Sequence, residues 1–317
     1  MSKPYEDWAA RIRTGDRRAI ARAISVMESG EAPAIPLLKM LFPSSRAAHV
    51  LGVTGPPGAG KSTLVELLAG GYRRRDVKVG ILAVDPTSPF SGGALLGDRI
   101  RMQHLFTDDG VYIRSMAARG RLGGIAAGTS DAVVVLEAAG YDMVLIETVG
   151  VGQGEVDIAS LADATLVVLA PGMGDDVQAL KAGVLEIADL FVINKADRPG
   201  ADHLAHEITS TIALAPGRDG WTPPVLQTIA TSAQGVDGVE KAIDDFRAYC
   251  VASSVHGKRQ REMWRHRLLH LVQEDLFGRW SRSRPPDGSI DIQIERIIRR
   301  EQDPYSAAEE LAGGLFH

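Results

Sequence analysis

The segment GPPGAGKS at positions 55–62 constrains the fold of this chain more than any other feature. It matches the phosphate-loop pattern Gly-x-x-x-x-Gly-Lys-Ser, and it stands between an apolar run at 49–54 and a run of helix-forming residues from 63 onward. In this pattern the backbone N–H groups of the loop and the positive end of the following helix converge on a polyphosphate. The segment therefore predicts an α/β domain that binds a nucleoside triphosphate.

The residues of the loop have separate expected roles. Lys61 is expected to reach the β- and γ-phosphates as a point charge, and the hydroxyl of Ser62 to ligate the Mg²⁺ that accompanies them. The glycines supply the permissive backbone that the loop needs. The predicted nucleotide contacts in this segment are Gly55, Pro56, Pro57, Gly58, Ala59, Gly60, Lys61, Ser62 and Thr63.

Apolar runs alternate with amphipathic segments through the middle of the chain. Continuous apolar runs are typical of strands buried on both faces of a parallel sheet. Between them lie helical patterns, for example at 129–139 and 175–187. The sequence therefore predicts a doubly wound, mainly parallel sheet, with ligands at the carboxyl ends of its strands. The runs after the first one are 77–85, 141–150, 164–170, 189–197 and 224–233.

Helical patterns flank this region on both sides. Residues 1–43 are expected to form an N-terminal helical extension, 44–249 the nucleotide-binding domain, and 250–317 a C-terminal helical arm. The arm carries two apolar stripes that it cannot bury alone, so it must pack on the nucleotide domain or on a second subunit, and the second option would make a homodimer through these helices. Asp303-Pro304 predicts the start of a last short helix. The stripes are Trp264, Leu268, Leu271, Val272 and Leu276, and then Ile290, Ile294, Ile297 and Ile298.

Composition argues against several classes of function. The net charge is −5 with both signs interspersed, so we expect no nucleic-acid partner. No apolar run approaches the roughly 20 residues of a membrane span, and the first residues lack an apolar signal core, so a cytoplasmic protein without membrane attachment is expected. A single cysteine, Cys250, excludes an internal disulfide and a Cys-x-x-Cys site, and a buried or half-buried structural thiol is expected there.

The segment Asn194-Lys195-Ala196-Asp197, at the end of a predicted strand, predicts selectivity for guanine. The Asp197 carboxylate can accept both N1–H and the exocyclic amino group of guanine, a donor pattern that adenine lacks. Asn194 would meet the other edge of the purine, and the stem of Lys195 would cover the ring face. Thr231, Ser232 and Ala233, at the end of the next predicted strand, loosely match a further loop that contacts the base, although a simple turn explains them nearly as well.

A carboxylate and a glycine follow the apolar run that ends at Ile146. Glu147 would hold Mg²⁺, and the N–H of Gly150 would sense the γ-phosphate. Asp85 and Asp98 bracket a glycine-rich segment that suits a switch ordered by the γ-phosphate. The predicted metal ligands are Ser62, Asp85, Asp98 and Glu147, and the predicted catalytic residues are Lys61, Asp85 and Glu147.

Together these motifs resemble the GTPase chaperones of adenosylcobalamin-dependent acyl-CoA mutases, the methylmalonyl-CoA mutase-associated family, also described as arginine/ornithine transport-system kinases. The resemblance implies GTP hydrolysis to GDP that gates cofactor loading on a partner mutase and removal of damaged cobalamin. It rests on GPPGAGKST at 55–63, VDPTSPFSGGALLGDRIRM at 84–102, RGRLGGIA at 119–126, ETVGVGQ at 147–153, PGMGDDVQALKAG at 171–183, NKAD at 194–197 and DPYSAAEEL at 303–311.

The resemblance also implies how hydrolysis is coupled to the partner. Small signalling GTPases carry a water-positioning glutamine where this chain has Val151, which cannot orient water. We therefore expect slow intrinsic hydrolysis that rises when a mutase completes the site. The residues implied for partner coupling are Gln153, Asp175, Gln178 and Lys181.

Three alternatives remain open from the residues. A nickel-delivering GTPase would need a histidine-rich tract or a cysteine pair, and the 8 histidines here are scattered. A kinase that transfers the γ-phosphoryl group to an acceptor would favour ATP, against which the Asn-Lys-x-Asp segment argues. A nucleotide-gated scaffold without catalysis would release no phosphate over multiple turnovers.

Overall fold

The computed structural model describes residues 3–85, 105, 107–117, 124–148, 160–173, 184–214, 218–282 and 289–313. The chain divides into two compact units, Met1–Met263 and Trp264–His317. The first unit contains the sheet and most of the helices, and the second contains helices alone.

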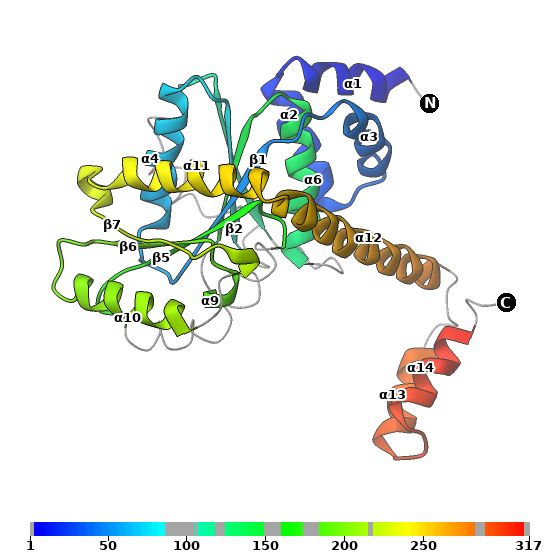
Figure 1. Ribbon diagram of the computed structural model, residues 1–317. Helices are drawn as coiled ribbons and strands as arrows, with labels where there is room; N and C mark the ends of the chain where they lie inside the picture. Colours follow the sequence, from blue (N-terminus) through cyan, green and yellow to red (C-terminus); the bar gives the residue numbers. More distant parts are fainter. Residues whose placement is uncertain are drawn as a thin grey trace. The chain divides into compact units, whose positions relative to one another are not determined.

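A seven-stranded parallel sheet in the order β3-β2-β4-β1-β5-β6-β7 forms the centre of the first unit (Figure 1). Strands β1, β4, β5 and β6 are buried along their whole length, as their β-branched apolar sequences predict. The predicted doubly wound α/β fold is confirmed. The strands are β1 (His49–Thr54), β2 (Val79–Asp85), β3 (Val111–Ala117), β4 (Met143–Thr148), β5 (Ala164–Leu169), β6 (Leu190–Asn194) and β7 (Val225–Thr228).

Helices cover both faces of the sheet. Helices α4 (Lys61–Arg74) and α11 (Val236–Ala252) lie together on one face, where they close one apolar core. Helices α6 (Gly124–Ala138) and α10 (Ala201–Leu214) pack against the alternate side chains of the same strands. Cys250 of α11 is buried in the first of these cores, as predicted.

Three helices precede the sheet and pack on α6: α1 (Lys3–Arg13), α2 (Arg17–Ser29) and α3 (Ala34–Leu41), followed by the 3₁₀ turn η1 (Phe42–Ser44). Asp16 caps α2 by accepting hydrogen bonds from the N–H groups of Arg18 and Ala19, at 2.9 and 3.1 Å. Gly30 ends the helix in the left-handed conformation. The apolar faces of these helices share one core with α6 and strands β2 and β4, so the N-terminal helices are built into the first unit.

The structure differs from the strand prediction at one edge of the sheet. Strand β3 was not expected from its sequence, because Arg114 and Ser115 interrupt its apolar pattern. Arg114 pairs with the buried carboxylate of Glu28 on α2 at 2.5 Å. A residue far away in sequence thus neutralises the charge that interrupts the apolar pattern of this strand. At the other edge, β7 ends at Thr228, five residues before the end of the predicted apolar run.

The remaining helices form the C-terminal part of the chain. Asp303 caps the last helix through the N–H groups of Tyr305 and Ser306, as the Asp-Pro pair predicts. In the second unit Glu310 accepts hydrogen bonds from Gln293 and Arg296, at 2.7 and 3.1 Å. Among the described residues no helix is long and apolar enough to cross a membrane. The helices are α12 (Val255–Arg282), α13 (Ser289–Ile298) and α14 (Pro304–Ala312), and the short α9 (Val184–Ile187) precedes β6.

Candidate nucleotide site

The predicted phosphate loop joins β1 to α4 at the carboxyl edge of the sheet. Gly55, Gly58 and Gly60 have φ values of +133°, +79° and +95°, which side chains rarely adopt. A Cβ atom on Gly55 would lie 2.0 Å from the carbonyl oxygen of Val168 in β5. The loop therefore keeps its shape because glycine alone fits between these backbones.

Lys61, the first residue of α4, is buried with 6% of its surface exposed. Its Nζ donates to the carbonyl oxygens of Gly55 at 2.7 Å and Pro56 at 3.0 Å. The ammonium group thus lies inside the loop, bonded to the backbone of the loop itself. This position suits a point charge that meets phosphate oxygens at the start of a helix.

Ser62 and Glu147 meet across the loop. The Ser62 hydroxyl donates to Oε1 of Glu147 at 2.6 Å, although the two residues are 85 positions apart. The sheet causes this contact, because β1 and β4 are neighbours and Val53 is in register with Glu147. One residue further, Thr148 and Thr54 share a hydrogen bond of 3.0 Å between their hydroxyls. Two of the four predicted metal ligands are therefore adjacent.

The backbone of Asp85 ends β2 at the same edge, since Val84 is in register with Thr148 of β4. The side chain of Asp85 lies outside the described part of the structure. The same holds for other residues singled out from the sequence, so their predicted roles stay predictions. These residues are Asp98, Gly150, Val151, Gln153, Asp175, Gln178 and Lys181.

Asn194, at the end of β6, joins three parts of the site. Its Nδ2 donates to the carbonyl oxygen of Ala59 in the phosphate loop at 2.9 Å. Its Oδ1 accepts from the hydroxyl of Thr228 and from the N–H of Ala230, both at 3.1 Å. The amide is 2% exposed, and Gly60 leaves it room, because a Cβ there would lie 2.2 Å from Nδ2. Asn194 therefore holds the loop, β6 and the end of β7 together.

Lys195 and Asp197 follow on the surface of this junction. Lys195 has a left-handed φ of +58°, and its Nζ donates to the carbonyl oxygen of Gly58 at 2.6 Å. Its stem thus spans from the Asn-Lys-x-Asp segment to the phosphate loop. Asp197 is exposed, so its carboxylate is available to a ligand.

The donors to Oδ1 of Asn194 lie in a triplet that begins three residues before the predicted one at 231–233. These donors are Thr228 and Ala230, whereas Thr231, Ser232 and Ala233 are exposed in and after the 3₁₀ turn η4 (Ala230–Ser232). Both triplets read Thr-x-Ala, so the motif alone allowed either register. The position of the strand end distinguishes the two triplets, because Thr228 is the last residue of β7.

The site combines a phosphate loop, a hydroxyl beside a carboxylate, and an Asn-Lys-x-Asp segment at the end of a strand. These features define a phosphate-loop nucleotide-binding protein of the GTPase class. A family model described as methylmalonyl-CoA mutase-associated GTPase MeaB matches residues 20–284. The chain belongs to this family, which confirms the resemblance drawn from its motifs, and it is a GTPase that takes guanine nucleotides.

Relatives agree with this assignment. A protein of Pyrococcus horikoshii named "putative GTPase" is 44% identical over 310 residues, which cover 97% of each chain. The methylmalonic aciduria type A homolog, mitochondrial, of Mus musculus is 32% identical over 315 residues, 94% of this chain and 76% of that protein. A crystal structure of an LAO/AO transport system kinase superposes with a TM-score of 0.76 at 26% identity, covering 100% of this chain and 99% of that one.

Proposed function

We propose that this protein is a GTP-hydrolysing chaperone that gates adenosylcobalamin loading onto a partner acyl-CoA mutase, of the methylmalonyl-CoA mutase type, and that protects or reactivates that enzyme. Membership of a family whose name couples a GTPase to methylmalonyl-CoA mutase supports the partner class. The name of the mouse relative supports it as well. A homodimer in the cytoplasm, without nucleic-acid or membrane partners, completes the proposal.

The contact between Ser62 and Glu147 is the observation that carries the hydrolytic part. A hydroxyl and a carboxylate 2.6 Å apart beside a phosphate loop form a hard oxygen donor set, which is the kind that Mg²⁺ prefers. We propose that these two residues hold Mg²⁺, with Asp85 and Asp98 contributing further oxygen atoms. When bound, the ion would neutralise charge on the phosphate oxygens.

Lys61 then has a defined role. Its ammonium group is buried and donates to the carbonyl oxygens of Gly55 and Pro56, and phosphate oxygens can take the place of those carbonyls at little cost in reorganisation. It stabilises the negative charge that grows on the phosphate oxygens as the bond to the leaving group breaks. We propose Glu147 and Asp85 as the other catalytic residues.

The guanine base occupies the surface beside Asn194, Lys195 and Asp197 in this proposal. Asp197 accepts from the base, the stem of Lys195 covers its face, and Asn194 fixes both strand ends around it. Thr231, Ser232 and Ala233 complete the base loop, next to Ala230. Selection of GTP over ATP follows from the carboxylate of Asp197.

Hydrolysis is proposed to be slow until the partner completes the site, with Gln153, Asp175, Gln178 and Lys181 as the coupling residues. The test is phosphate release over many turnovers with purified protein, alone and with adenosylcobalamin-dependent methylmalonyl-CoA mutase. We expect a faster rate with the mutase, and loss of turnover in Lys61→Met, with Lys241→Met on the exposed face of α11 as the matched control. Equal rates with and without candidate mutases would contradict the partner proposal.

The same assay separates the other activities that the sequence left open. Excess ATP should compete poorly with GTP. Transfer of labelled phosphate to an acceptor instead of water would make the protein a kinase, and absence of turnover would make it a scaffold.

A further inference from the structure

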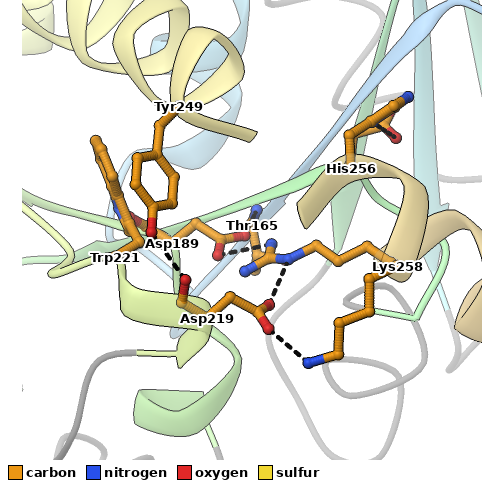
Figure 2. Close-up of polar contacts among 9 residues, drawn as sticks. Thr165, Asp189, Asp219, Trp221, Tyr249, His256 and Lys258 are labelled. Atoms are coloured by element: carbon orange, nitrogen blue, oxygen red, sulfur yellow. Dashed lines mark hydrogen bonds and ion pairs between the residues drawn. The ribbon is translucent and has the colours of Figure 1, made fainter. Parts of the chain in front are cut away.

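Arg259, in the second turn of α12, bridges two aspartates that precede the amino ends of β6 and β7, whereas the phosphate loop follows the carboxyl end of β1. Its Nη1 donates to Oδ1 of Asp189 at 2.9 Å, and its Nε donates to Oδ2 of Asp219 at 3.0 Å. Asp219 also accepts from Nζ of Lys258 at 2.9 Å, as Figure 2 shows. The guanidinium group thus joins two carboxylates that the sequence places 30 residues apart.

Both aspartates make further hydrogen bonds, Asp189 through its carboxylate and its carbonyl and Asp219 through its carbonyl. Asp189 directly precedes β6, and its Oδ2 accepts the N–H of Thr165 in β5 at 2.9 Å. Its carbonyl oxygen accepts from Nε1 of Trp221 at 2.9 Å, just before β7. Asp219 has a left-handed φ of +56°, and its carbonyl oxygen accepts the hydroxyl of Tyr249 at 2.8 Å (Figure 2). Asp189 is thus fixed at the start of β6, and Asp219 in the turn that leads into β7.

This pair of contacts is shielded from water. The side chains of Arg259 and Asp189 are 11% and 2% exposed, and the guanidinium group lies 5.1 Å from the centre of the Phe246 ring. Burial opposes ionisation of Asp219, but the hydrogen bonds from Lys258 and Arg259 outweigh it and lower the pKa of that carboxyl. A guanidinium fork can serve two carboxylates in one fixed geometry, whereas an ammonium group acts as a point charge.

Strands β6 and β7 connect this bridge to the nucleotide site. They pair in register from Phe191 with Val225 to Asn194 with Thr228, and β7 is four residues long and, among the described strands, pairs with β6 alone. The carboxyl end of so short an edge strand depends on where its amino end is held. At that carboxyl end Thr228 and Ala230 donate to Asn194.

We propose that Arg259 is a positioning residue for the guanine site: by joining Asp189 to Asp219 it fixes β7 against β6, and so keeps Thr228 and Ala230 on Asn194. The proposal rests on the guanine site proposed above. In this proposal the first turns of α12 influence nucleotide affinity from the amino ends of β6 and β7, whereas the proposed base site lies at their carboxyl ends.

The test compares Arg259→Met with Arg261→Met, an exposed arginine two residues along the same helix, in the full chain. GDP affinity is measured by titration calorimetry and the melting temperature without nucleotide by calorimetric scanning. We expect Arg259→Met to weaken GDP binding roughly fivefold, the lower end of ordinary coupling between sites, and Arg261→Met to leave it unchanged. Arg259→Lys, which can serve one carboxylate at a time, should give an intermediate value.

A double-mutant cycle separates positioning from general loss of stability. If Arg259 acts through Thr228, then Arg259→Met in a Thr228→Val background should weaken GDP binding less than it does in the wild type. Additive effects, or an unchanged GDP affinity with a lowered melting temperature, would overturn the proposal. If Arg259→Met does not fold, Asp219→Asn can be measured instead, because it weakens one side of the bridge. We expect Asp219→Asn to weaken GDP binding as well.

Failure of the guanine site itself gives a different result. In that case Asn194→Ala would bind GDP as tightly as the wild type. A strong effect of Asn194→Ala beside no effect of Arg259→Met or Asp219→Asn would refute the role of Arg259 alone.

Discussion

Replacement of Gly60 by alanine should damage both the fold and the nucleotide site. Gly60 has a φ of +95°, and a Cβ atom there would lie 2.2 Å from Nδ2 of Asn194. The left-handed backbone costs about 1–2 kcal/mol for a residue with a side chain. Displacing the buried amide from the carbonyl oxygen of Ala59 leaves polar groups unsatisfied, at about 1–3 kcal/mol. We therefore expect Gly60→Ala to lower the free energy of unfolding by about 2–5 kcal/mol.

Gly15 offers a matched control for this substitution. Its φ is +81°, and no atom lies within 4 Å of the position that its Cβ would take. Gly15→Ala should therefore carry the backbone cost alone, about 1–2 kcal/mol. Urea denaturation gives both free energies, and titration calorimetry with GDP should show weakened binding in Gly60→Ala and unchanged binding in Gly15→Ala.

Removal of the amide tests the cause directly. In an Asn194→Ala background, Gly60→Ala should cost no more than Gly15→Ala, because the clash has gone. The reasoning is refuted if Gly60→Ala and Gly15→Ala destabilise equally in the wild type, or if the cost of Gly60→Ala persists without Asn194.

Three further predictions each concern one side chain. Thr228→Val, which keeps the shape but loses the hydroxyl, should weaken GDP binding by about 1 kcal/mol through Asn194, and Thr228→Ser should restore it in calorimetric titration. Burial raises the pKa of Glu137 from 4.5 to about 7, so between these pH values the folded state holds a proton that the unfolded chain has lost. The free energy of unfolding should therefore fall as pH rises from about 4.5 to 7, by about 1–3 kcal/mol after allowance for partial exposure. Denaturation of Glu137→Gln should lack this slope, and an unchanged slope would disprove its origin. Asp303→Ala should cost the last helix about 1 kcal/mol, seen as faster amide exchange at 304–312 than in the wild type.

The sheet and the phosphate loop could be predicted because their causes are local. Runs such as ATLVVL at 164–169 are apolar at every position, which suits a strand covered on both faces. The positive φ angles of the loop glycines are likewise a local requirement, whereas the close approaches of Gly55 to Val168 and of Gly60 to Asn194 exist only in the folded chain. Strand β3 could not be predicted, because Arg114 is accommodated by Glu28, and that pairing exists only in the folded chain.

The candidate site shows the same division. Lys61, Ser62 and Glu147 were identified from motifs, and the contact between the last two needed only β1 and β4 to be neighbours. The part played by Thr228 was missed, since two Thr-x-Ala triplets follow one another at 228–233 and only the end of the strand selects one of them. The bridge through Arg259 joins three distant segments, and no spacing in the sequence indicates it.

The buried cysteine has a practical consequence for experiments on this protein. Cys250 is 5% exposed, and burial raises the pKa of its thiol to about 11. At neutral pH the thiol therefore stays protonated, and the thiolate is the form that reacts with labelling reagents. A cysteine introduced at an exposed position can therefore receive a fluorophore or spin label selectively, while the natural residue stays in place and the core remains intact.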